Sequence, residues 1–206
     1  VYPAQHLSQE IIDQIVDYTR RIAIGLNVKG VLNIQYIVAD GELNVIEVNP
    51  RSSRTVPFIS KVTGINMVEC ATRIALGESL KDLGLPLGLV PNKPYVAVKA
   101  PVFSFSKMGL VEIALGPEMK STGEVMGIGR TYSEALFKAI NGANMRIPED
   151  GTILMTVADR DKEEASQLAK GFIELGYHIE ATGGTGKYFK EHGVDCKIVN
   201  KISEGN

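Results

Sequence analysis

The sequence predicts two domains of different fold class. We expect an α+β domain, with helices around an antiparallel sheet, over residues 1–147, and an incomplete α/β domain with a doubly wound parallel sheet over residues 148–206. The first observation is alternating apolar and polar residues on both sides of Asp40-Gly41, which is typical of a β-hairpin. The second is a strand–helix–strand–helix–strand order after Gly151, which is typical of a parallel sheet.

Composition excludes several classes of protein. The 206 residues include 24 acidic and 22 basic side chains, so a net charge of −2 gives no electrostatic case for nucleic acid or a membrane surface. The first residues lack the features of a signal peptide, and no apolar run reaches transmembrane length. Two distant cysteines predict neither a disulfide framework nor a zinc site, which indicates a cytoplasmic protein. Because the chain begins at Val1 and ends without a closing element, we expect a piece of a longer protein.

Each element of the first domain has a local signal. Ser8 is a candidate N-cap for an amphipathic helix, and Thr131 with Glu134 forms a T-x-x-E capping box before another helix. Residues 83–97 are rich in Gly and Pro and predict a loop. The remaining expected elements are a hairpin over 30–50, a helix over 66–75, a strand over 96–105 interrupted by Pro101, and a strand over 121–129.

The elements of the second domain are also predicted from local signals. Strands are expected at 152–157, 177–181 and 196–200, and helices at 161–176 and 187–193. The segment "TGGTG", residues 182–186, is expected to be a tight loop between a strand and a helix. Backbone N–H groups and hydroxyls at such a place can bind an anion, although a plain glycine-rich turn is the alternative.

The register of the hairpin decides which side chains meet. A two-residue loop places Ile46 opposite Gln35 and mixes polar and apolar groups on both faces. A three-residue loop places Glu47 opposite Gln35 and gathers the apolar side chains, Ile46 included, on one face. We therefore expect the three-residue loop, with Gln35, Glu47 and Asn49 together on the polar face.

This polar face has the chemistry of a metal site. Amide and carboxylate oxygens are hard donors that suit Mg²⁺ or Mn²⁺, and these ions commonly bridge a protein to nucleotide phosphates. Arg51 and Arg54 follow at once and can bind phosphate, carboxylate or bicarbonate through two parallel hydrogen bonds. A solvated sheet face with two surface arginines is the alternative.

Two longer motifs indicate a particular protein family. "IEVNPRSSRTVPFISKVTG" with the upstream Gln35, and the later "LGPEMKSTGEVMGIGRT", closely resemble the large subunit of carbamoyl-phosphate synthetase, in its second ATP-grasp half. The region after Gly151 resembles that subunit's allosteric domain, of the methylglyoxal-synthase-like fold. The resemblance implies a ligase that phosphorylates carbamate to carbamoyl phosphate with ATP and Mg²⁺ or Mn²⁺, for pyrimidine and arginine biosynthesis.

The resemblance also implies roles for particular residues. Gln35, Glu47 and Asn49 would be the metal ligands, with Gln35 and Glu47 also at the nucleotide, and Arg51 and Arg54 would face the anion that is phosphorylated. In the second domain it implies a set of effector-binding residues for UMP, IMP or ornithine-type effectors: Lys162, Thr182, Thr185 and Lys201. The segment from Lys120 to Glu124 is interpreted as scaffold.

Partners follow from the same resemblance. They are a small glutaminase subunit and the upstream half of the large chain, which in the family carries the adenine pocket and the phosphate-covering loop. This chain by itself is therefore expected to be inactive. Two alternatives stay open: a module that only binds effectors, and another ATP-grasp ligase such as a purine-pathway enzyme.

Overall fold

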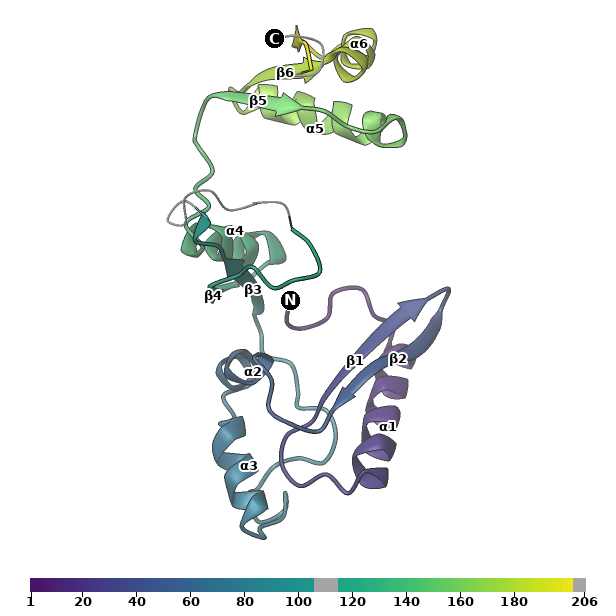
Figure 1. The fold of residues 1–206 in the computed structure, drawn as a ribbon, viewed down its shortest axis with the longest axis vertical. Coiled ribbons are helices and arrows are strands. Elements are labelled where there is room, and N and C mark those ends of the chain that lie inside the picture. Colours follow the sequence, from purple (N-terminus) through teal and green to yellow (C-terminus); the bar gives the residue numbers. More distant parts are fainter. Residues whose placement is uncertain (106–114, 202–206) are drawn as a thin grey trace. The chain divides into compact units, whose positions relative to one another are not determined.

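A computed structural model describes residues 1–105 and 115–201 (Figure 1). It separates into two compact units, Val1–Arg146 and Ile147–Asn206, whereas the sequence placed the boundary after residue 147. The first unit holds antiparallel pairs and the second a parallel sheet, so the small sheets have the directions that the sequence predicted.

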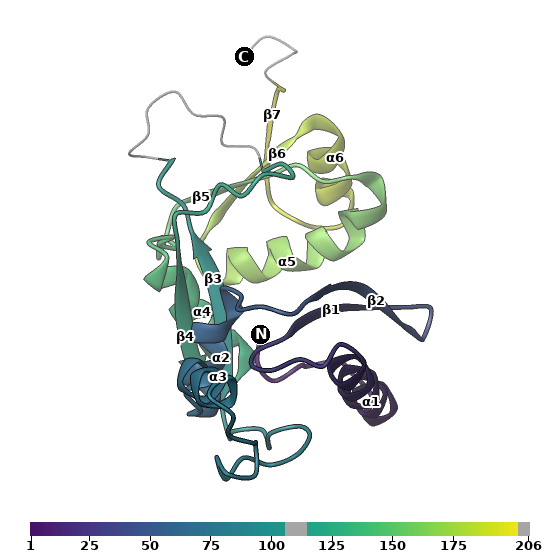
Figure 2. The same cartoon turned by 60° about the horizontal axis from the view of Figure 1, so that its bottom comes forward.

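The first unit begins with a helix that supports a hairpin. Its elements are α1 (Gln9–Gly25), β1 (Asn33–Ala39), β2 (Glu42–Asn49), α2 (Thr55–Thr63), α3 (Met67–Ala75), β3 (Val96–Val102), β4 (Gly123–Gly129) and α4 (Tyr132–Gly142). The Ser8 hydroxyl accepts a hydrogen bond from the N–H of Ile11, as the N-cap signal predicted. A hydrogen bond of 2.8 Å between the hydroxyls of Thr19 and Tyr36 ties α1 to the hairpin, which runs alongside the helix (Figure 2).

A second pair of strands, β3 and β4, is packed between helices. On one side, Ala135 and Ala139 of α4 are fully buried against β4. A Cβ on Gly127 would lie 2.1 Å from the backbone oxygen of Ala135, so only glycine allows this approach. On the other side, Phe58 and Val62 of α2 form a buried cluster with the sheet.

Two expectations about this unit were wrong. No helix was expected over residues 55–63, where the structure has α2. Pro57 is tolerated because it lies in the first turn, where its missing N–H has no helical partner. Strand β3 is also not interrupted at Pro101, which pairs with Glu124. Every strand of a two-stranded sheet is an edge strand, and an edge strand can accommodate proline.

The second unit is a parallel sheet with the strand order β5-β6-β7. Its elements are β5 (Thr152–Met155), a 3₁₀ turn η2 (Asp159–Asp161), α5 (Lys162–Glu174), β6 (His178–Thr182), α6 (Gly183–Glu191) and β7 (Lys197–Val199). Both helices pack on one face of the sheet, around the fully buried Phe189 and Ala181. The other face carries Leu154, Glu180 and Lys197, and none of this unit's described helices covers it.

The segment "TGGTG" differs from its expected form. It is the end of β6 and the first turn of α6, which begins at Gly183 rather than at Lys187. Its glycines have distinct environments: a Cβ on Gly186 would lie 2.8 Å from Cγ1 of Ile198, whereas one on Gly183 would meet nothing within 4 Å. Gly186 is therefore needed for packing between helix and sheet.

Candidate functional site

The hairpin brings Gln35 and Glu47 directly opposite each other. Their Cα atoms are register partners, and the amide Nε2 of Gln35 donates a 3.0 Å hydrogen bond to Oε2 of Glu47. The next partners on the same face are Asn33 and Asn49. The predicted polar face is therefore present, with Gln35, Glu47 and Asn49 on it.

The route to this register differs from the expected one. The loop has two residues, Asp40 and Gly41, with φ of 53° and 81°, as a type I′ turn requires. Between Gln35 and Tyr36 the partner changes from Glu47 to Val45, so Ile46 is the extra residue of a β-bulge. The three-residue loop was wrong, and so was Ile46 in the apolar set, because its side chain is 61% exposed.

The bulge has a consequence for the site. On the face toward α1, the pairs Ile34–Val48 and Val38–Leu43 stay apolar along the whole hairpin, and Leu43 is buried. Without the extra residue, a two-residue loop would turn Glu47 and Leu43 to the same side. Bulges commonly re-aim a side chain beside a functional site, and here Glu47 is the side chain that changes face.

The donor set suits a hard divalent cation. The Gln35–Glu47 hydrogen bond uses the amide nitrogen, so the amide oxygen Oε1 and the second carboxylate oxygen are not part of it. Glu47 is exposed, so water and a phosphate can complete a coordination shell. Among the residues that the structure describes, no three His, Cys, Asp or Glu side chains gather as a metal cluster, so a cation here would depend on the amides.

The two arginines lie on either side of a short loop between β2 and α2. The side chain of Arg51 is exposed, and its Nη1 donates to the carbonyl of Ser52 at 3.1 Å. Arg54 occupies the N-cap position of α2, and its Nη1 contacts the sulfur of Met119 at 2.6 Å. No local pattern in the sequence indicates this contact, because the two residues are 65 positions apart.

The second unit places Lys162 beside the start of α6. Nζ of Lys162 lies 3.7 Å from the position that a Cβ on Gly184 would occupy, and it forms a 2.6 Å ion pair with Asp159. The hydrogen bond from Lys162 lowers the pKa of the Asp159 carboxyl. The lysine side chain is 14% exposed, and Asp159 is almost fully exposed. A phosphate approaching from solvent would therefore compete with an exposed carboxylate for this ammonium group.

The two threonines are held in different ways. The Thr182 hydroxyl donates to the hydroxyl of Thr156 at 2.9 Å. Thr185 is 3% exposed, and its hydroxyl accepts a 3.2 Å hydrogen bond from the N–H of Val157. Thr185 therefore ties α6 to the end of β5. Lys201 is exposed and follows β7.

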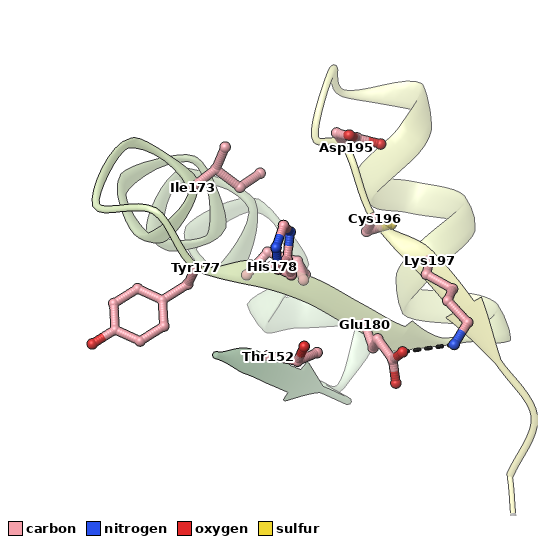
Figure 3. A pocket seen from close by; sticks show the side chains of 9 residues that line it. Thr152, Ile173, Tyr177, His178, Glu180, Asp195, Cys196 and Lys197 are labelled. Atoms are coloured by element: carbon pink, nitrogen blue, oxygen red, sulfur yellow. Dashed lines mark hydrogen bonds and ion pairs between the residues drawn. The ribbon is translucent and has the colours of Figure 1, made fainter. Parts of the chain in front are cut away.

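The same sheet has a cavity at its opposite edge, which the sequence analysis did not anticipate. Its lining includes the first residues of the three strands, Thr152, His178 and Lys197, and its volume is about 420 Å³. Glu180 and Lys197 also line it; Figure 3 shows their side chains pointing toward each other, and their ion pair measures 2.8 Å. A mixed lining of paired charges gives this cavity less anion-binding character than the edge with Lys162.

No helix in the part of the chain that the structure describes is long and apolar enough to cross a bilayer.

Residues 1–83 match the family model of the carbamoyl-phosphate synthase L chain, ATP binding domain, and residues 164–206 match that of the MGS-like domain. The carbamoyl phosphate synthase large chain of Agathobacter rectalis is 53% identical over 204 residues. That match covers 99% of this chain and 19% of the relative, so the chain spans about one fifth of the relative's length.

Proposed function

We propose, on the premise that the chain is homologous to a C-terminal part of carbamoyl phosphate synthase large chains, that it supplies one lobe of a phosphoryl-transfer site and part of a regulatory domain. In this proposal residues 1–147 are the C-terminal part of an ATP-grasp domain that phosphorylates carbamate. Residues 148–206 are part of the MGS-like allosteric domain. The product, carbamoyl phosphate, would serve pyrimidine and arginine biosynthesis in the cytoplasm.

The observation that carries the proposal is the pairing of Gln35 with Glu47 on a face that also holds Asn49. Gln35, Glu47 and Asn49 would hold Mg²⁺ or Mn²⁺, with Gln35 and Glu47 also meeting the ATP phosphates. When bound, the cation would neutralise charge on the phosphates, which is a main contribution to catalysis of phosphoryl transfer.

Arg51 and Arg54 would bind and orient the anion that accepts the phosphoryl group. A guanidinium can donate two parallel hydrogen bonds to a carboxylate-like anion, and so fixes its plane as well as its position. Both arginines lie within five residues of Asn49 in sequence, so a short loop links the proposed metal ligands to the proposed anion ligands.

The second unit would bind a nucleotide effector through its phosphate. Lys162 would contribute charge, and Thr182 and Thr185 would position the first turn of α6, whose N–H groups can meet an anion. Lys201 completes the proposed set. UMP, IMP and ornithine-type effectors are the candidates, and the proposed partners are a glutaminase subunit and the upstream half of a large chain.

Two other functions were considered. A pure effector-binding module would keep only the role of the second unit, and we expect no more than this of the 206-residue chain by itself. Another ATP-grasp ligase is disfavoured, because residues 164–206 match the MGS-like domain.

The test is Glu47→Gln in a synthetase large chain that carries this segment. A neutral amide holds a divalent cation more weakly than a carboxylate does, so ATP formation from ADP and carbamoyl phosphate should fall by about 100-fold or more. The matched control is Glu42→Gln, at the other end of β2, which should keep its activity. Near-normal turnover in Glu47→Gln would contradict the proposal.

A further inference from the structure

A cavity of about 400 Å³ lies between the start of α2 and the start of β4. Arg54 and Pro57 line it from α2, and Ser121, Thr122 and Glu124 line it from the opposite side. The second group belongs to the stretch that the sequence analysis interpreted as scaffold. It lies between the two segments that match family models.

The charges around this cavity favour an anion. The carboxylate of Glu124 is engaged by Nζ of Lys99 at 3.2 Å, so that negative charge is offset. The guanidinium of Arg54 contacts the thioether of Met119, which is a weak acceptor without charge. Met119 therefore fixes the position of the guanidinium and leaves its positive charge uncompensated at this contact.

The two hydroxyl residues of this wall have different roles. Thr122 anchors the wall to β3, because its N–H donates to the carbonyl of Val102 at 2.8 Å and its hydroxyl lies 2.8 Å from that of Ser104. Among residues 1–105 and 115–201, the hydroxyl of Ser121 has no hydrogen-bond partner, although Ser121 is partly buried and lines the cavity.

We propose that Ser121 and Arg54 bind one small planar oxyanion in this cavity. The guanidinium binds two oxygens of the anion, and the hydroxyl of Ser121 donates to an oxygen on the same ligand. Met119 acts as a positioning residue for Arg54. The inference rests on the proposed function: the oxyanion is the acceptor of the phosphoryl group, and the cavity also has room for its phosphorylated form.

The experiment measures ATP formation from ADP and carbamoyl phosphate in a large chain that carries this segment. Ser121→Ala removes one hydrogen bond to a charged ligand, so the KM for carbamoyl phosphate should rise about 10-fold. The KM for ADP should change by less than about twofold. Ser121→Thr keeps the hydroxyl and should restore most of the affinity. Ser133→Ala, an exposed serine of α4, is the matched control and should change neither KM.

A double-variant cycle tests whether one ligand meets both side chains. If Ser121 and Arg54 share the anion, Ser121→Ala combined with Arg54→Lys should raise KM by less than the product of the single effects. If the two single effects on KM multiply in the double variant, the shared site is wrong. An unchanged KM in Ser121→Ala would overturn the inference alone if Glu47→Gln still abolishes turnover. If Glu47→Gln is also active, the proposed function and this inference fail together.

Discussion

The hairpin of the first unit and the sheet edge of the second offer opposite chemistry to a phosphate group. The hairpin presents an exposed carboxylate, Glu47, with amide neighbours, and such a surface repels phosphate unless a cation lies between them. The sheet edge presents the ammonium of Lys162 beside the first turn of a helix, which attracts phosphate directly. The difference teaches that metal dependence should belong to the first unit alone.

Removal of divalent metal should give the largest difference between the activities of the two regions. In a large chain that carries this segment, excess EDTA should lower phosphoryl transfer by about 100-fold or more, because the carboxylate face then has no cation to hold phosphate. Binding of UMP or IMP, measured by calorimetry in the same solution, should change by less than about twofold. An equal loss in both assays would break the comparison.

Alanine substitutions at two glycines of α6 should show which of them is needed for packing of the helix on the sheet. Gly186→Ala should destabilise the chain by about 1–3 kcal/mol relative to Gly184→Ala, because its Cβ would lie 2.8 Å from Ile198 Cγ1. In Gly184→Ala the nearest atom is Nζ of Lys162 at 3.7 Å, an ordinary contact. Both variants replace glycine by alanine in the same helix, so the difference in their urea midpoints mainly reports the packing effect. Equal midpoints would contradict the packing role.

Two variants test the role of Lys162 in effector binding. Lys162→Ala should weaken UMP or IMP binding by about 10-fold, through loss of a charge-assisted hydrogen bond. Asp159→Asn removes the carboxylate that competes for the same ammonium and should tighten binding by about two- to threefold. Calorimetry on the 206-residue chain measures both, with Lys170→Ala on the same helix as the control. Weaker binding in Asp159→Asn would show that the carboxylate supports the site.

The smallest expected effect concerns the hairpin alone. Gln35→Glu places a second carboxylate opposite Glu47, and like charges across a strand pair should cost about 0.5 kcal/mol. The thermal midpoint should fall by about 1–2 °C without metal and should rise again with Mg²⁺. Asn44→Asp, opposite Ile37, is the control and should show no Mg²⁺ response. A midpoint that ignores Mg²⁺ in Gln35→Glu would count against a cation at this face.

The sequence predicted the polar face of the hairpin but not how the backbone builds it. The pairing of Gln35 with Glu47 followed from the segregation of apolar side chains, and the turn at Asp40-Gly41 followed from residues that accept positive φ. The bulge at Ile46 had no local signal. It reconciles a two-residue turn with an apolar face that packs on α1, which is a constraint of tertiary structure.

Other misses have similar causes. Helix α2 carried a usable signal in Gly64, whose φ of 77° gives the left-handed conformation that commonly ends a helix. Pro57 and the β-branched residues lower the helix propensity of the segment before Gly64. The cavity with Arg54 and Ser121 could not be foreseen, because it depends on how α2 packs against β4.

The most direct test of the central claim is the position of Mn²⁺. Crystals of a large chain that carries this segment, grown with Mn²⁺ and ADP, should give an anomalous peak at about 2.0–2.3 Å from the Glu47 carboxylate. Oxygens of Gln35 and Asn49 should lie in the same coordination shell. A nucleotide-bound Mn²⁺ held by other residues, with the Gln35–Glu47 pair facing solvent alone, would contradict the account.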